Sequence, residues 1–261
     1  EDVLGVVLDG TGWGGDGTIW GGELLLGSYA VVRRVGHLRP VALPGGDTAV
    51  RRPARTALAH LDAAGVPWET SVPSVREAAG AEEAAVRSML RSGAGCTPTT
   101  SMGRLFDAVA SLLDVRHDVD YEGQAAMELE ALAARFDGAA PDGFGIPVLV
   151  EDGSLVLDPR GAVERAAHWV RDGGDAAAAA RAFHEAVADA VLAAALAVRD
   201  EHGTAVVGLT GGVFQNALLT QGCAGRLEAA GFRVLVHRAV PPNDGGLALG
   251  QVVVAGHGDG P

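Results

Sequence analysis

Two segments of the chain combine closely spaced glycines with a carboxylate, a pattern that could bind a phosphate group. In the first, GVVLDGTGWGGDGTIWGGE (residues 5–23), an apolar run ends at Asp9 and is followed by Gly10, Thr11 and Gly12. Glycine admits positive φ and lets a bound group approach the backbone N–H donors directly, so this segment could cradle a phosphate. The same segment is typical of a β-hairpin with Asp16-Gly17 as a two-residue turn. Both interpretations can hold, because a hairpin lined with N–H groups is itself an anion site.

The second segment lies in the C-terminal part, where the order of elements favours a ligand site. TAVVGLTGG predicts a buried strand that ends at Gly211 and Gly212, and VFQNALLTQGCAGRLEAAG predicts a helix that opens at Phe214. A further strand, FRVLVHRAV, and a turn with Asp244 follow. This β–α–β order is typical of a parallel strand pair with a ligand at its carboxyl end, toward which the helix N-terminus would point. Two glycine-rich strand ends with Asp9 and Asp244 predict a nucleotide cleft with capacity for a metal ion, although Asp244 could instead cap the next helix.

The elements that must position these residues follow from periodicity. Residues 4–43 are predicted to form strands, and the period becomes helical from about residue 54. In SMGRLFDAVASLLD the apolar residues recur at helical spacing and leave Arg104, Asp107 and Ser111 on the opposite face, with Arg104 expected to be a surface or ion-pair residue.

Three further elements are expected. GQAAMELEALAARF predicts a helix whose Glu128 and Glu130 would ordinarily form a solvated face, and a hairpin is expected to turn at Asp152-Gly153. An alanine-rich helix should run from Asp175 to about His202, with His184 packed inside rather than catalytic.

Composition predicts an acidic globular protein. With 48% hydrophobic residues, 38 glycines and 5% aromatic residues, the 261-residue chain suits an α/β protein with a large core and tight loops. The net charge of −13 disfavours nucleic acid as a partner. No apolar run is long enough to cross a membrane, and Cys96 and Cys223 are too far apart to predict a disulfide framework or a zinc site. We therefore expect a cytoplasmic protein with free thiols. Because it begins without Met and enters a strand at once, we expect it to be part of a longer chain.

Six motifs, in the same order, resemble the C-terminal region of HypF carbamoyltransferases, which mature the iron centre of nickel–iron hydrogenases. They are LDGTGWGGDGTIWGGE, HLRPVALPGGD, TSMGRLFDAVASLL, YEGQAAMELEALA, GLTGGVFQNALL and PPNDGGLALGQ. More distantly, the chain is similar to antibiotic O-carbamoyltransferases and to the TsaD family of tRNA threonylcarbamoyl transferases. The resemblance implies the α/β ASKHA fold, with duplicated ribonuclease-H-like lobes around a nucleotide cleft. Residues 1–50 would be the remainder of a first lobe that is incomplete at its N-terminus, and residues 51–261 a helical insertion and the second lobe.

The resemblance also implies roles for single residues. Phosphates would lie against two glycine-rich groups, which are Asp9, Gly10, Thr11 and Gly12 in the first and Gly211 and Gly212 in the second. The nucleoside would contact Asp107, Gly123, Glu128 and Asn216. The ligand would be ATP, AMP or carbamoyl adenylate. Asp244, together with Asp9, would bind a divalent metal, either iron, zinc or magnesium; the resemblance assigns no catalytic residue.

The implied activity is carbamoyl transfer from carbamoyl adenylate to the C-terminal cysteine thiol of a HypE-like partner. A carbamoyl carbonyl is a poor electrophile because its nitrogen donates into it, so transfer needs a mixed anhydride and a site that stabilises developing charge. No enzyme nucleophile is required, which agrees with the lack of a Ser or Cys in an elbow or triad context.

Part of the family pattern is missing, and two alternatives stay open. The family's HxxxH metal motif lies upstream of LDGTG, and no two of the eight histidines here are spaced i, i+4. An upstream adenylate-forming domain is therefore an expected partner. The first alternative is an O-carbamoyltransferase that acts on a small-molecule hydroxyl. The second, favoured by the missing histidines, is a non-catalytic nucleotide-binding module.

Overall fold

The computed structural model describes residues 2–29 and 31–257. The strands are β1 Val3–Trp13, β2 Ile19–Gly27, β3 Val32–Leu38, β4 Val41–Pro44, β5 Cys96–Thr99, β6 Val148–Glu151, β7 Ser154–Leu157, β8 Val206–Thr210 and β9 Arg233–Val236. The helices are α1 Asp47–Arg51, α2 Pro53–Ala63, α3 Pro73–Glu77, α4 Ala81–Ser92, α5 Met102–Leu112, α6 Gln124–Ala133, α7 Arg160–Arg171, α8 Ala176–His202, α9 Ala217–Ala229 and α10 Leu247–His257. Two short 3-10 turns lie at Gly212–Gln215 and Asp244–Gly246.

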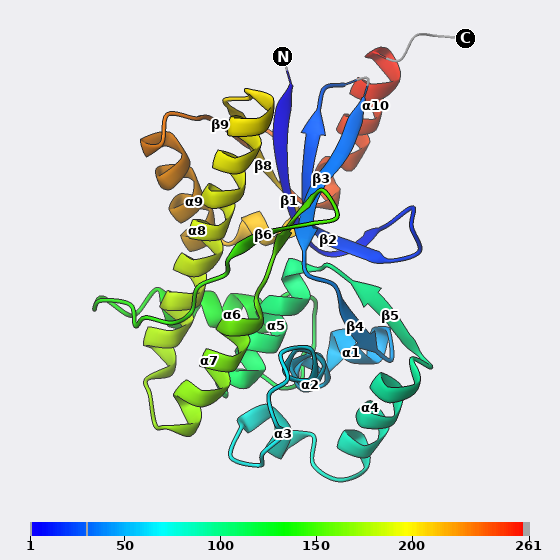
Figure 1. The fold of residues 1–261 in the computed structure, drawn as a ribbon, viewed down its shortest axis with the longest axis vertical. Helices are drawn as coiled ribbons and strands as arrows, with labels where there is room; N and C mark the ends of the chain where they lie inside the picture. The colour runs from blue at the N-terminus through cyan, green and yellow to red at the C-terminus, as the bar shows by residue number, and fades with distance from the viewer. Residues whose placement is uncertain (1, 30, 258–261) are drawn as a thin grey trace.

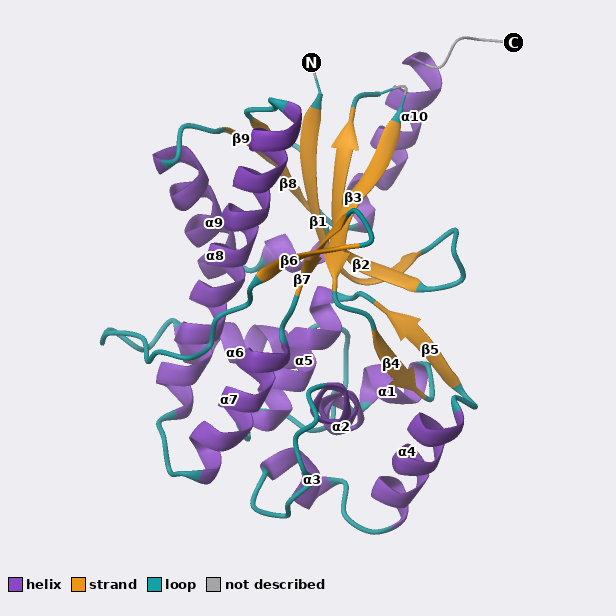
Figure 2. Ribbon diagram, in the orientation of Figure 1, coloured by secondary structure: helices purple, strands orange, loops and turns teal. Residues whose placement is uncertain are grey.

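The strands form a mixed sheet in the order β6-β7-β3-β2-β1-β8-β9, to which β4 and β5 are joined through β2. Strands β1, β2 and β3 are antiparallel neighbours, whereas β8 is parallel to both β1 and β9. Figure 1 shows most of the sheet in the upper half of the molecule, with α8 and α9 on one side and α10 on the other, whereas β4, β5 and most remaining helices lie below. The secondary-structure colouring of Figure 2 separates this strand-rich half from the helical half. The α/β class expected from the sequence is confirmed.

The strands of the N-terminal segment share one sheet with those of the C-terminal segment. Residues 4–7 of β1 pair in parallel with residues 207–210 of β8. The boundary expected at residue 50 therefore does not separate two sheets in the described part of the chain. The division into a remainder of one lobe and a complete second lobe stays a prediction.

Strand β1 carries a bulge at the first glycine-rich segment. Leu8 pairs with Gly22 and Gly12 with Trp20, so residues 9–11 lie opposite Gly21 alone. A Cβ on Gly21 would lie 2.5 Å from the Asp9 carbonyl oxygen, so only glycine fits there. A bulge frees its residues from the ladder and redirects their side chains, and here it releases Asp9 and Gly10 from pairing.

One of the two expected hairpin turns is correct and the other is wrong in length. Asp152 and Gly153, with φ of 50° and 78°, join a β6–β7 hairpin in which Glu151 pairs with Ser154. The β1–β2 hairpin is confirmed, but Trp13 pairs with Ile19, so five residues, 14–18, join its strands. The Asp16 carboxylate accepts hydrogen bonds from the Thr18 hydroxyl (2.6 Å) and amide (3.0 Å), which stabilise this longer loop.

The helices follow the sequence pattern, with two differences. The alanine-rich helix α8 begins after Asp175, whose carboxylate accepts from the Ala177 amide (2.9 Å), and it ends at Gly203 with φ of 73°. Helix α9 begins at Ala217 rather than Phe214, because residues 212–215 form a 3-10 turn. Helix α5 is buried on every side, since α2, α6, α7 and β1 all contact it.

Crossing a bilayer would need a longer or more apolar helix than any in residues 2–29 and 31–257.

Candidate functional site

A pocket of about 280 Å³ lies where the β1 bulge, the residues after β8 and the helices α5 and α6 meet. Six of the residues predicted from the sequence line it: Asp9, Gly10, Asp107, Gly123, Gly212 and Asp244. The other lining residues are Gly103, Arg104, Glu122, Ala126, Val213, Gln215 and Asn243. The fold thus brings the two glycine-rich strand ends together, as expected.

Asp9 joins the two glycine segments. Its Oδ1 accepts hydrogen bonds from the backbone N–H groups of Gly10 (2.8 Å) and Gly212 (3.3 Å). A Cβ on Gly212 would lie 3.0 Å from this oxygen, so a side chain there would press on the Asp9 carboxylate. These two N–H groups were expected to face a phosphate, but in the structure they bind Asp9. The backbone phosphate cradle expected at Gly10 and Gly212 stays a prediction.

The N-terminus of α5 packs directly against the β1 bulge. The Ser101 side chain contacts the carbonyl oxygen of Asp9 (2.9 Å) and accepts from the Arg104 amide (3.1 Å), which caps the helix. A Cβ on Gly103 would lie 2.8 Å from the Gly10 Cα, so this glycine permits the close approach of helix and strand. As a result, Arg104 and Asp107 lie one turn apart on the pocket wall.

Arg104 and Asp107 form a buried ion pair. Each is 3% exposed, and Arg104 Nη1 lies 3.0 Å from Asp107 Oδ2. This contact lacks hydrogen-bond angles, so Nη1 and Nε of Arg104 have no hydrogen-bond partner among the described residues. Burial raises the pKa of Asp107 to about 6, Arg104 opposes that shift and the nearby Glu122 carboxylate adds to it. The expectation that Arg104 lies at the surface is wrong, and its alternative, an ion pair, is correct.

Five predicted residues do not line this pocket: Thr11, Gly12, Glu128, Gly211 and Asn216. Gly12 is paired with Trp20 in the hairpin, where a Cβ would lie 2.9 Å from the Trp20 carbonyl oxygen, and Thr11 beside it is exposed. Glu128 accepts two hydrogen bonds from Arg116, at 2.9 and 2.7 Å, and these lower its pKa. The ribose contact implied for Glu128 has no support in this geometry, because its carboxylate is engaged on another surface.

Asn216 is used to fix the start of α9. Its Oδ1 accepts from the Leu219 amide (2.8 Å), and its Nδ2 lies 2.9 Å from His184 Nε2. Because His184 Nδ1 lies 2.7 Å from the Ala180 carbonyl oxygen and must donate to it, Nε2 is the acceptor of the Asn216 amide. Burial lowers the pKa of His184 to about 4, so the ring is neutral. This confirms a packed His184 and leaves the adenosine contact implied for Asn216 without support here.

The N-terminus of α9 is also occupied by protein. Glu130 Oε1 accepts from the backbone N–H groups of Ala217 (2.7 Å) and Leu218 (3.2 Å). The positive end of the helix dipole, which was expected to face the ligand, is thus neutralised by a carboxylate from α6. Glu130 joins α6 to α9 and is not part of a solvated face.

A second hollow, of about 670 Å³, adjoins the first and shares Asp9, Asn243 and Asp244 with it. It lies between α10 and the strand ends, and Gly211, His237 and Leu247 also line it. Gly211 has φ of 99°, and a Cβ there would lie 2.1 Å from the Leu8 carbonyl oxygen. A glycine is therefore needed where the chain leaves β8 and passes close to β1. Asn243 Oδ1 accepts from the Gly245 amide (3.1 Å), so Asn243, not Asp244, caps the turn before α10. The exposed Asp244 carboxylate is left available to the two hollows.

The carboxylates of the two hollows offer few ligands for a metal ion. Within residues 2–29 and 31–257, no three His, Cys, Asp or Glu side chains are placed to hold a metal together. Structural or catalytic zinc needs three or four such ligands, so zinc does not fit these residues alone. Magnesium binds through one or two carboxylates plus phosphate oxygens and waters, which Asp9 and Asp244 could supply beside a nucleotide.

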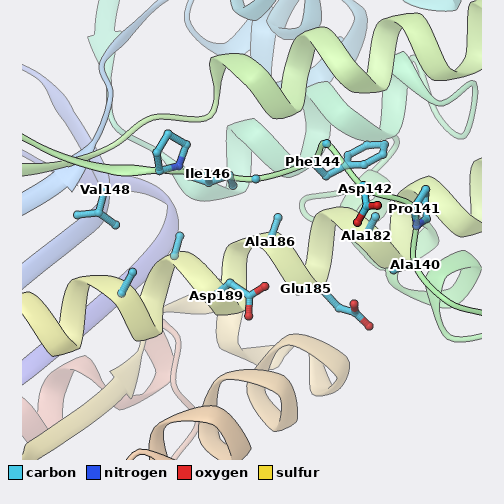
Figure 3. A pocket seen from close by; sticks show the side chains of 15 residues that line it. Ala140, Pro141, Asp142, Phe144, Ile146, Val148, Ala182, Glu185, Ala186 and Asp189 are labelled. Carbon is cyan, nitrogen blue, oxygen red and sulfur yellow. The ribbon is translucent and has the colours of Figure 1, made fainter.

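A third hollow, of about 520 Å³, lies elsewhere, between residues 140–148 and α8 (Figure 3). Figure 3 shows Phe144 and Ile146 on the loop side, with Glu185 and Asp189 on the helix. None of the predicted site residues lines it. Two of its acidic side chains, Glu185 and Asp189, form ion pairs with Arg181 and Arg226.

Sequence reasoning missed two residues of the pocket, Arg104 and Glu122. Arg104 stands at i, i+3 to Asp107 on the polar side of an amphipathic helix, and Glu122 directly precedes Gly123. For Arg104, the available indication was its position three residues before Asp107, the predicted ribose contact, on the same face of the helix. The burial of Arg104 and the approach of Glu122 to the pocket could not be predicted, because they depend on the β1 bulge and on the position of α6.

Comparison with known proteins gives a consistent result. The family model described as "Carbamoyltransferase, Kae1-like Domain, second subdomain" matches residues 5–251. The chain is 42% identical to a carbamoyltransferase HypF homolog of Cupriavidus necator, covering 98% of this chain and 65% of that protein. It is 40% identical to carbamoyltransferase HypF of Rhodobacter capsulatus, covering 96% of this chain and 32% of that protein.

Solved structures agree. The chain superposes with a TM-score of 0.89 on full-length HypF in a phosphate- and nucleotide-bound form, at 34% identity over 98% of this chain and 33% of that one. The TM-score against T. kodakarensis HypF is 0.84, at 31% identity over 98% of this chain and 34% of that one. The chain therefore spans between about a third and two thirds of the length of these relatives.

Proposed function

The chain belongs to the HypF carbamoyltransferase family, and from this premise we propose that it transfers a carbamoyl group from carbamoyl adenylate to the C-terminal cysteine thiol of a HypE-like partner. The observation that carries the proposal is the pocket in which Asp107, Gly123 and Gly212 meet beside the Asp9 carboxylate. The relatives are longer than this chain, so an upstream adenylate-forming domain belongs to the proposal. So does a cytoplasmic location, which the two free cysteines favour.

The reaction would proceed by direct attack on the adenylate. The partner's thiolate attacks the carbamoyl carbon, a C–S bond forms, the C–O bond to the phosphate breaks and AMP leaves with the electron pair. Asp107 would accept hydrogen bonds from the ribose hydroxyls and so orient the anhydride toward the thiol. Gly123 directly precedes α6, and no heavy atom lies within 4 Å of the position its Cβ would take, so there is open space beside it for the nucleoside.

The cysteines of this chain favour direct transfer. Burial raises the pKa of the Cys223 thiol to about 12, so its nucleophilic thiolate is scarce at neutral pH. Burial also raises the pKa of Cys96, and neither thiol lines the pocket. A covalent carbamoyl–enzyme intermediate on cysteine has no support here, so the acceptor supplies the nucleophile.

A divalent cation is an optional part of this proposal. Asp9 and Asp244 would hold magnesium, with phosphate oxygens and waters completing its ligands. When bound, such an ion would neutralise charge on the leaving phosphate. Iron or zinc would need further ligands beyond these two.

Nucleotide binding is the first test. We expect calorimetric titration with AMP and magnesium to show binding by the chain, and Gly212→Val to weaken it by about tenfold or more, because a bulky side chain would displace Asp9. Gly225→Val in α9 is the matched control, since a Cβ there would meet no atom within 4 Å. Equal binding by all three proteins would place the nucleotide elsewhere.

Transfer itself is the second test. The region is joined to an upstream segment that carries the adenylate-forming domain, and a partner with a C-terminal cysteine is supplied with carbamoyl phosphate and ATP. Mass spectrometry should find a carbamoyl group on the partner's thiol. If only a small-molecule hydroxyl were carbamoylated, the O-carbamoyltransferase alternative would replace this proposal.

A further inference from the structure

The pocket has an unusual balance of charge for a nucleotide site. Four carboxylates line it, those of Asp9, Asp107, Glu122 and Asp244, and the only cationic side chain among the lining residues is Arg104. A phosphate that entered such a site would be repelled unless a cation compensated. The position and hydrogen bonding of Arg104 therefore decide whether the pocket can accept an anion.

The hydrogen-bonding capacity of Arg104 is not satisfied by the protein. The side chain is 3% exposed, yet its Nε and Nη1 find no hydrogen-bond partner within the described residues. Guanidinium carries five N–H donors, and leaving buried donors unpaired is costly. The backbone N–H groups of Gly10 and Gly212 already donate to Asp9, at 2.8 and 3.3 Å, which leaves them less available to an anion than the guanidinium.

Part of the guanidinium also lies beside Gly10 of the first glycine-rich segment. A Cβ placed on Gly10 would be 3.4 Å from Arg104 Nη2 and 3.3 Å from the Glu122 carboxylate. The space over Gly10 is thus bounded by the guanidinium, and glycine keeps it open. The carboxylate of Asp107, the expected ribose contact, lies 3.0 Å from Arg104 Nη1, so a phosphate at the guanidinium would lie close to the ribose site.

We propose that Arg104 binds the phosphate of the adenylate and so makes the pocket select nucleotides over nucleosides. This inference rests on the proposed function, because it assumes that a nucleotide is the ligand. A planar guanidinium suits this role, since it can offer two parallel N–H donors to phosphate oxygens. It would retain the ion pair of Nη1 with Asp107 and offer the N–H donors of Nη2, which lies beside Gly10, to the ligand.

A structural role makes a different prediction. If Arg104 only neutralised Asp107, its loss would disturb the pocket for every ligand alike. The pair AMP and adenosine separates the two roles, because these ligands share the base and ribose and differ in the phosphate.

The experiment is calorimetric titration of the chain and its variants with AMP and with adenosine. We expect Arg104→Met to weaken AMP binding by about 10- to 100-fold, the value of a charge-assisted contact, and adenosine binding by less than about threefold. Arg104→Lys should recover part of the AMP affinity, because lysine restores the positive charge but lacks the two parallel N–H donors of the guanidinium. The double variant Arg104→Met, Asp107→Asn removes the buried carboxylate that Arg104→Met alone would leave unpaired. Compared with this double variant, the single variant Asp107→Asn, which keeps Arg104, should bind AMP more tightly and adenosine equally well. Thermal unfolding checks that each variant is folded.

The outcomes separate this inference from the proposed function. Equal losses for AMP and adenosine in both backgrounds would overturn the phosphate role of Arg104 while leaving a nucleotide pocket in place. The same holds if the unaltered chain binds adenosine as tightly as AMP. If the unaltered chain bound neither ligand, both the proposed nucleotide site and the phosphate role of Arg104 would be overturned.

Discussion

At the scale of single residues, the ionisation of Asp107 controls what the pocket can bind. Its pKa is raised to about 6 chiefly by burial, so it is ionised at neutral pH and mostly protonated at pH 5. An ionised carboxylate accepts hydrogen bonds from two hydroxyls, whereas the protonated form has lost part of that capacity. Because the folded pKa lies above the ordinary value of 3.8, Asp107 also lowers folding stability as the pH rises from about 4 through 6.

We therefore expect adenosine to bind about tenfold more weakly at pH 5 than at pH 7.5, because one pH unit below a pKa of about 6 leaves roughly a tenth of the carboxylate ionised. Adenosine is the suitable ligand, since the phosphate of a nucleotide itself titrates near pH 6. Calorimetry at several pH values measures the effect. Asp107→Asn cannot ionise and should show weaker binding that does not change across this range. A wild-type affinity that is flat with pH would show that the carboxylate is not the nucleoside contact.

The same residue scale shows what the sequence could and could not predict about the site. Asp9, Gly10, Asp107, Gly123, Gly212 and Asp244 were predicted and do meet in one pocket. Glu128 and Asn216 were placed there by family resemblance, but each is held by a partner distant in sequence, Arg116 or His184. Spacing along the chain predicts that residues share a helix face, and it contains no information about which partner from another element occupies their hydrogen bonds.

At the scale of elements, local sequence signals predicted most boundaries. The Asp152-Gly153 turn, the Asp175 cap and the alanine-rich helix are set by residues adjacent in sequence, so they could be predicted. The β1 bulge and the complete burial of α5 could not, because both depend on packing with Gly21 and with three other helices. Periodicity assigned one face of α5 as polar, yet that face lines a pocket and is as buried as the apolar face.

The start of α9 gives a prediction at this scale. Asn216→Ala removes the helix cap and leaves His184 Nε2 without its donor, so we expect the free energy of unfolding to fall by about 2 kcal/mol. Asn216→Ser keeps a capping oxygen but is too short to reach the ring, and should recover about half of the loss. Urea unfolding measures both. Equal stability of the three proteins would mean that neither hydrogen bond contributes to the fold.

At the scale of the whole molecule, the sheet and the helical half enclose one core, whereas α10 stands apart from it. None of the residues of α10 is buried, although most are apolar. Leu247 and Val254 face the larger hollow beside the site, and Leu249 and Val252 are absent from its lining. Leu249 is 52% exposed and Val252 68%, and exposed apolar faces of this kind are typical of surfaces that contact another protein or domain.

This arrangement predicts that the outer face of α10 can be made polar without cost to the fold. We expect the double variant Leu249→Asp, Val252→Asp to reduce binding of the dye ANS and any concentration-dependent association, because it removes the apolar side chains on which both depend. The free energy of unfolding should change by less than about 0.5 kcal/mol, as for other exposed positions. Gln251→Asp, on the same helix but already polar, is the matched control and should leave dye binding unchanged. A large loss of stability in the double variant would show instead that α10 is packed against the body of the protein in solution, and an unchanged dye signal would show that the apolar surface lies elsewhere.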